Sequence, residues 1–177
     1  MPELPEVEVT RRRISPLLCG REIAAVTARP ASSFFLTPPA TLRRRLLGRR
    51  VVALDRRGKY LLGELDDGSR LLLHLGMTGQ LVAASAESPR LYRLRDRHAG
   101  ASATPGSASD EHVHLRLGFR DRGEEIRFRD PRRFGRVQWL AAEAACPRLE
   151  RLGPDALEAT AAALRGALAR RRAPIKA

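Results

Sequence analysis

Short apolar runs, several of them joined by glycine turns, recur along the chain between residues 21 and 140. The runs have strand length, about 4–8 residues. A glycine follows Arg57, Asp67 and Arg122 at junctions between runs, as in turns that join antiparallel strands. The pattern predicts a mainly β fold of six to eight strands in a two-sheet antiparallel β-sandwich. The runs lie at 22–28, 50–56, 59–65, 70–75, 112–119, 125–128 and 136–140.

Three helices are expected beside these strands, at residues 5–18, 37–47 and 155–172. Pro5 suits a first helical turn, and Pro16 with Gly20 suits the end of that helix. Thr37 is expected to cap the second helix. Asp155 is expected, with Glu158, to open the third.

Two domains are expected, a β-sandwich domain at 1–148 and the beginning of a helical module at 149–177. The apolar stripe of the second part ends close to the last residue, so we expect a truncated helical segment there. Residues 83–110 are rich in Ala, Ser, Arg, Pro and Gly with little periodicity, which is typical of a long surface loop.

The formal charge of +13, from 33 basic and 20 acidic residues, favours a polyanionic partner such as nucleic acid. Aromatic residues make up only 5% of the chain, which favours duplex over stacked single strands. No apolar run reaches the length of a membrane span, and the acidic start is unlike a signal peptide. We expect a cytoplasmic protein with no membrane contact, in which Cys19 and Cys146 are reduced thiols.

Pro2 offers a secondary amine if Met1 is removed. An α-amino group has a pKa of about 8, so part of it is unprotonated and nucleophilic at neutral pH. Glu3 and Glu6 are close enough in sequence to exchange protons with it. Two other readings stay open at this point: a plain helix start, and a tautomerase that uses the proline amine as a base.

A glycine-bracketed loop at 76–79 and a second loop at 130–135 place apolar side chains where they could probe a duplex. Met77 lies in the first, and Arg132 and Phe134 lie in the second. Such side chains can fill the space left by an extruded base, although core packing is the alternative for each. His74 fits a core histidine. His112 and His114 share a strand face without a third ligand, so no metal site is predicted.

Seven motifs occur in order along the chain, and the set resembles the formamidopyrimidine-DNA glycosylase family. They are PELPEVE at 2–8, GKYL at 58–61, HLGMTG at 74–79, EHVH at 111–114, DPRRFG at 130–135, LGPDAL at 152–157 and RRRAPIK at 170–176. The resemblance implies a base-excision-repair enzyme that removes oxidised purines such as 8-oxoguanine and formamidopyrimidines. It also implies β,δ-elimination at the abasic site.

The resemblance assigns roles to individual residues. Pro2 would form the Schiff base, Glu3 would protonate the sugar, and Lys59 would contact phosphate and assist elimination. Met77, Arg132 and Phe134 would fill the void. DNA contacts would come from His112, Arg132 and Arg171, while Glu6, His74 and Lys176 would lie near the site or the DNA backbone.

The chain departs from the family pattern after PIK, where members continue through a helix-two-turn-helix module into a four-cysteine zinc finger. We therefore expect no cofactor in this chain. Glu111 replaces a common lysine, and the loop before it is longer than usual. A monomer is expected for the family, although loss of the second half would promote self-association. A catalytically weak or silent DNA-binding fragment remains the alternative.

Overall fold

The computed structural model describes residues 2–29, 33–84 and 112–169. The chain divides into two compact units, Met1–Ala144 and Ala145–Ala177, and each is described by itself.

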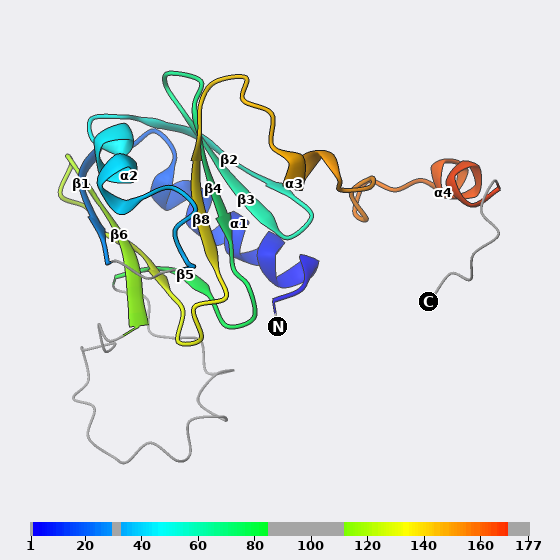
Figure 1. Cartoon of the computed structure of the whole chain (residues 1–177), viewed down its shortest axis with the longest axis horizontal. Coiled ribbons are helices and arrows are strands. Elements are labelled where there is room, and N and C mark those ends of the chain that lie inside the picture. Colours follow the sequence, from blue (N-terminus) through cyan, green and yellow to red (C-terminus); the bar gives the residue numbers. More distant parts are fainter. Residues whose placement is uncertain (1, 30–32, 85–111, 170–177) are drawn as a thin grey trace, which may run out of the picture. The chain divides into compact units, whose positions relative to one another are not determined.

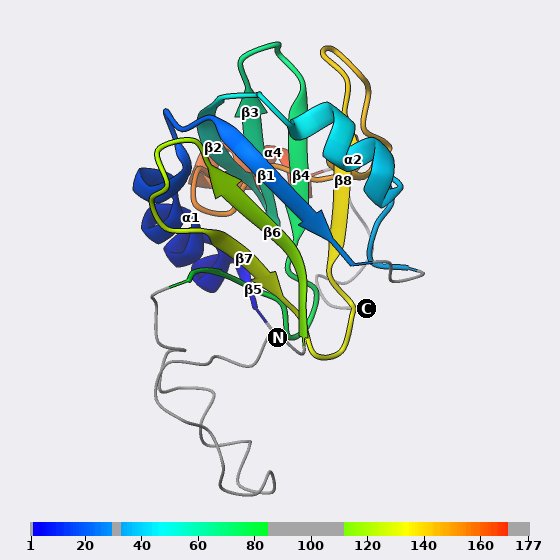
Figure 2. The ribbon, with the colours of Figure 1, turned by 90° about the vertical axis from the view of Figure 1, so that its left-hand side faces the viewer.

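Unit 1 is a sandwich of two four-stranded antiparallel sheets, as the sequence predicts (Figures 1 and 2). The first sheet has the order β1–β6–β7–β5 and the second has the order β2–β3–β4–β8. The bounds of the first are Ile23–Ala28, Val113–Phe119, Ile126–Arg129 and Gln80–Ala83. Those of the second are Val51–Arg57, Tyr60–Leu65, Arg70–His74 and Arg136–Leu140.

Two helices flank the sandwich on opposite sides (Figure 2). Helix α1 (Leu4–Leu18) packs against β2 of one sheet and β5 of the other. Its buried residues Val7, Ile14 and Leu18 recur at helical spacing, so one face of the helix joins the core. Helix α2 (Pro39–Leu46) packs against β1 and β8 through Leu42 and Leu46.

Helix α1 ends at Leu18, as predicted, with Pro16 inside its last turns, and the Cys19 N–H donates to the Ser15 carbonyl at 2.9 Å. Two other local features differ from the prediction. Thr37 does not cap α2; its hydroxyl accepts from the Trp139 N–H at 2.9 Å instead. Strand β5 was not predicted, since four residues give little periodicity, and it takes Ala83 out of the expected loop. The rest of that loop, 85–110, lies outside the described residues.

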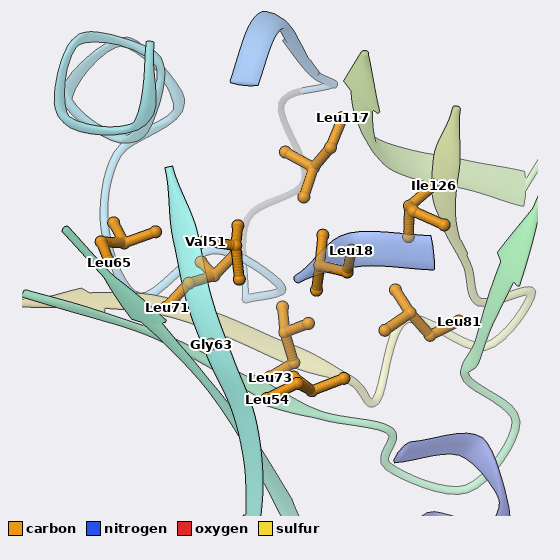
Figure 3. Close-up of a pocket in the computed structure, with 10 residues that line it drawn as sticks. All are labelled: Leu18, Val51, Leu54, Gly63, Leu65, Leu71, Leu73, Leu81, Leu117 and Ile126. Atoms are coloured by element: carbon orange, nitrogen blue, oxygen red, sulfur yellow. The ribbon is translucent and has the colours of Figure 1, made fainter. Parts of the chain in front are cut away.

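The core between the sheets is aliphatic and closely packed. Figure 3 shows side chains from both sheets and from α1 around a small internal space beside Gly63. The cavity of about 10 Å³ is lined by Leu18, Val51, Leu54, Gly63, Leu65, Leu71, Leu73, Leu81, Leu117 and Ile126. Such a volume is close to that of a single water probe, and its apolar lining offers water no hydrogen bond. The cavity is a packing gap with no room for a ligand.

Gly63→Ala is expected to raise the free energy of unfolding by about 0.5–1 kcal/mol. A Cβ at Gly63 would lie 3.8 Å from the Cβ and carbonyl oxygen of Leu71, an ordinary contact, and would fill part of the gap. Urea unfolding monitored by circular dichroism measures the change. Gly79→Ala is the control and should destabilise by about 1–3 kcal/mol, because its Cβ would lie 2.2 Å from the Leu75 carbonyl oxygen. A loss of stability in Gly63→Ala would contradict this packing.

Unit 2 contains two short helices, α3 (Pro147–Glu150) and α4 (Ala161–Leu168). Helix α4 begins later than predicted, because the Thr160 hydroxyl, rather than Asp155, caps it by accepting from the Ala163 N–H at 3.1 Å. Asp155 instead accepts from the Leu157 N–H in a turn that precedes the helix. Leu157, Leu164 and Leu168 are exposed. Within the described ranges of the chain, no helix has the length and hydropathy needed to cross a membrane.

Candidate active site

The residues before α1 place one proline and two carboxylates at the start of the helix. Pro2 is buried directly before Glu3, which is the N-cap residue and has extended backbone angles. The Glu6 carboxylate accepts a hydrogen bond from the Glu3 N–H at 3.0 Å. Glu6 therefore fixes the backbone of Glu3 and satisfies a helix N–H that would otherwise lack a partner.

The turn between β2 and β3 brings Lys59 to this helix start. Gly58 has a φ of +58°, a left-handed conformation that glycine adopts without strain, and the turn directs the next residue toward α1. The Lys59 Nζ lies 2.5 Å from the Glu3 Oε2, with 36% and 50% of the two side chains exposed. The fold thus brings an ammonium and a carboxyl group into contact beside Pro2, within reach of solvent and substrate.

A second ionic cluster, not predicted from the sequence, ties α1 to the same hairpin. The Glu8 carboxylate accepts from Arg11 at 2.8 Å, from Arg12 at 2.7 Å and from Arg56 of β2 at 3.0 Å. These hydrogen bonds, with Arg11 foremost, hold the pKa of Glu8 far below its ordinary value. The spacing of Glu8 to Arg11 and Arg12 is a recognisable helical pairing signal, whereas the contact with Arg56 depends on tertiary structure.

Met77 and Phe134, the predicted void-filling residues, lie on two loops at one end of unit 1. One loop joins β4 to β5 and the other joins β7 to β8; Figures 1 and 2 show both near the start of α1. Met77 is 39% and Phe134 is 44% exposed, so neither is a core residue. The Arg132 guanidinium lies over the Phe134 ring at 4.8 Å from its centroid.

His74 ends β4 and supports the loop that joins β4 to β5. Its Nδ1 accepts from the Gly76 N–H at 3.1 Å, and its ring packs on Tyr60 with 4.7 Å between centroids. The acceptor role requires that Nδ1 carry no proton. His74 thus shapes the turn that presents Met77.

Of the remaining predicted contact residues, His112 is bonded to the start of the loop that carries Phe134. His112 is half-buried just before β6, and its carbonyl accepts from the Asp130 N–H at 2.8 Å. His114 is buried, and its Nε2 lies 2.9 Å from the Asp130 carbonyl oxygen. Arg171 and Lys176 lie outside the described residues.

The zinc finger of the family does not fit this chain. Such a finger takes four cysteines, and the sequence has two, Cys19 and Cys146. Across the described parts of the chain, no cluster of three His, Cys, Asp or Glu side chains could hold a metal ion.

Fold and site together define a two-sheet sandwich domain that has, at one end, a proline, a Glu–Lys pair and two loops that each expose an apolar side chain. The family model for the formamidopyrimidine-DNA glycosylase N-terminal domain matches residues 1–137. The chain therefore belongs to the formamidopyrimidine-DNA glycosylase family.

Individual relatives agree with this assignment. The chain is 44% identical over 179 residues to the formamidopyrimidine-DNA glycosylase of Paracoccus denitrificans, covering 100% of this chain and 59% of that protein. The enzyme of the same name from Geobacter sulfurreducens is 44% identical over 156 residues, covering 88% of this chain and 49% of that protein. The chain thus spans about half to three fifths of the length of these relatives.

Solved structures show the same fold. A MutM complex with DNA containing carbocyclic 8-oxo-G has a TM-score of 0.64 at 29% identity, over 83% of this chain and 47% of that one. A Lactococcus lactis Fpg complex with DNA containing N7-benzyl-Fapy-dG has a TM-score of 0.60 at 30% identity, over 78% of this chain and 44% of that one.

Proposed function

We propose that this chain carries the catalytic centre of a DNA glycosylase that removes oxidised purines, 8-oxoguanine and formamidopyrimidines, and then cleaves the abasic strand. Family membership supports the glycosylase class. Related solved structures support the substrate class, since they are complexes with DNA that contains carbocyclic 8-oxo-G, Fapy-dG or an abasic site. The strand-cleaving step is supported by the chemistry of Pro2 and its neighbours.

The proposed reaction begins when the Pro2 amine attacks C1′ of the damaged nucleotide. The bond from C1′ to the base breaks, and the base leaves with the electron pair and takes up the proton that the Pro2 nitrogen loses. Glu3 donates a proton to the ring oxygen, the sugar opens, and C1′ becomes an iminium carbon bonded to Pro2. The iminium group accepts electrons from the neighbouring C–H bond, so β-elimination and then δ-elimination expel the two phosphates.

Lys59 completes this centre. Its ammonium group is placed to contact a phosphate and to assist elimination, and its contact with the Glu3 carboxylate at 2.5 Å holds that side chain beside Pro2. Glu6 holds the backbone of Glu3, and His74 shapes the nearby loop. Every proposed step uses groups of this chain and no cofactor.

Duplex DNA is the proposed partner. Its phosphates would be met by the excess of basic residues, with His112, Arg132, Arg171 and Lys176 among the contacts. Met77, Arg132 and Phe134 would enter the space left by the extruded nucleotide. We propose further that unit 2 begins a helix-two-turn-helix module, that residues 1–148 form the catalytic domain, and that the chain acts in the bacterial cytoplasm. The exposed leucines of unit 2 favour association with another apolar surface, including a second copy.

The Glu3–Lys59 pair beside Pro2 is the observation that carries this proposal. Borohydride reduction in the presence of duplex with one abasic site tests it. We expect one covalent adduct per chain, mapped by mass spectrometry to residue 2 of protein without Met1. An adduct on another residue, or a lack of adduct with enzyme that nicks the strand, would overturn the mechanism.

A further inference from the structure

The two loops that carry the apolar probes contact each other backbone to backbone. Gly76 has a φ of +64°, and a Cβ there would lie 2.5 Å from the Phe134 carbonyl carbon and 2.6 Å from the Gly135 nitrogen. Only glycine permits this approach. The loops of Met77 and Phe134 therefore pack directly against each other, although 52 residues separate Thr78 from Asp130.

One buried carboxylate joins these loops. Asp130 is 0% exposed. Its Oδ1 accepts from the Thr78 hydroxyl at 2.5 Å and from the Arg132 N–H at 3.2 Å, and its Oδ2 accepts from the Gly135 N–H at 2.7 Å. The first donor belongs to the Met77 loop and the other two to the Phe134 loop. Hydrogen bonds to a carboxylate are stronger than neutral ones, so the tie is stiff.

The backbone of Asp130 is itself fixed to β6. Its N–H donates to the His112 carbonyl at 2.8 Å, and its carbonyl oxygen lies 2.9 Å from the buried His114 Nε2. Asp130 thus links both loops to β6. This matters because Met77 and Phe134 are exposed, so core packing does not set their positions.

We propose that Asp130 is a positioning residue that locks the two loops into one wedge and sets the spacing of Met77 and Phe134 for insertion into duplex DNA. The inference rests on the proposed function. A wedge that is rigid before binding loses less conformational entropy on insertion than two independent loops would lose. Asp130 acts only through the loops and does not touch the reacting atoms.

The test compares Asp130→Asn with wild type on two abasic duplexes. In one duplex the abasic site faces a base, which the wedge must hold, and in the other it faces a tetrahydrofuran residue, which presents no base. We expect Asp130→Asn to reduce borohydride trapping at least about 10-fold on the first and less than about 3-fold on the second. Thr78→Val removes one of the three ties, so its effect should be smaller and in the same direction.

Asp67→Asn is the matched control. Asp67 accepts from the Ser69 N–H at 3.0 Å and the Ser69 hydroxyl at 2.6 Å in the turn before β4, whereas the Met77 loop follows β4. Removing that carboxylate should leave the ratio of the two trapping rates within about 2-fold of wild type. Circular dichroism compares the folded fraction of all variants, and Thr78→Val decides the question if Asp130→Asn does not fold.

A second readout does not depend on catalysis. A 2-aminopurine placed opposite tetrahydrofuran reports the stacking of the unpaired base through its fluorescence. Saturating wild-type protein should change this signal, and Asp130→Asn should lose at least half of the change. Equal losses of trapping on both duplexes, with an unchanged fluorescence response, would overturn the inference. Absence of trapping by wild type would overturn the proposed function instead, and the fluorescence arm would then decide on the wedge.

Discussion

Pro2→Ala is expected to reduce borohydride trapping on abasic duplex at least about 100-fold. The secondary amine of proline forms an iminium ion directly, and the buried ring holds the nitrogen at the start of α1 beside Glu3. Alanine offers a primary amine on a more flexible residue, so the amine is both a less effective nucleophile and less well oriented. Gel quantification of the reduced adduct over time measures the rate.

Pro5→Ala is the control for this experiment. Pro5 lies in the first turn of the same helix and is exposed, and the proposed chemistry gives it no role. Its trapping rate should stay within about 2-fold of wild type. If Pro2→Ala traps as fast as Pro5→Ala, the nucleophile is elsewhere in the chain.

The sandwich was predictable because its signals are local. Strand-length apolar runs and glycine turns identified seven of the strands, and Gly58 and Gly68 indeed adopt the positive φ of tight turns. The wrong cap prediction arose because two possible hydrogen-bond partners compete for one side chain. Thr37 has a hydroxyl suited to capping, but a partner on β8 takes it, and no pattern in the sequence reveals a contact 102 residues away.

The candidate site was predictable only in part for the same reason. Pro2 and Glu3 were named from the chemistry of an N-terminal amine and Lys59 from motif resemblance, whereas their proximity depends on how α1 lies against the β2–β3 hairpin. Asp130 was passed over in favour of the arginines and Phe134 beside it, since its role follows from burial. Glu8 and Arg56 were not singled out from the sequence, yet only 12% and 6% of their side chains are exposed.

Glu8→Gln is expected to lower the free energy of unfolding at pH 7 by about 2–3 kcal/mol. Breaking a fully buried ion pair costs about 3–5 kcal/mol, and the value here is smaller because Arg12 is 72% exposed and contributes little. Glu64→Gln, at an exposed glutamate of β3, is the control and should change stability by less than about 0.5 kcal/mol. Urea unfolding measures both.

The pH dependence identifies the cause. Folding lowers the pKa of Glu8, so its contribution is fully present above the ordinary value of 4.5 and is lost as the pH falls toward the lowered value. The difference between wild type and Glu8→Gln should therefore shrink between pH 5 and pH 2. Asp67 and Asp121, whose pKa values are also lowered, titrate in both proteins and cancel in the difference.

The same substitution connects stability to the site. Glu8 and Arg56 join α1, which carries Glu3, to the strand that leads into the Lys59 turn, and Arg56 also donates to the Gly58 carbonyl at 3.0 Å. Loss of the Glu8–Arg56 ion pair should let Glu3 and Lys59 separate. We therefore expect trapping by folded Glu8→Gln to fall about 10-fold at pH 7. In protein that already carries Lys59→Met, Glu8→Gln should cause a smaller further loss of trapping than it causes in wild type, because the two changes act on one contact. Fully additive losses in the double variant would show that Glu8 stabilises the sandwich without setting the geometry of the Glu3–Lys59 pair.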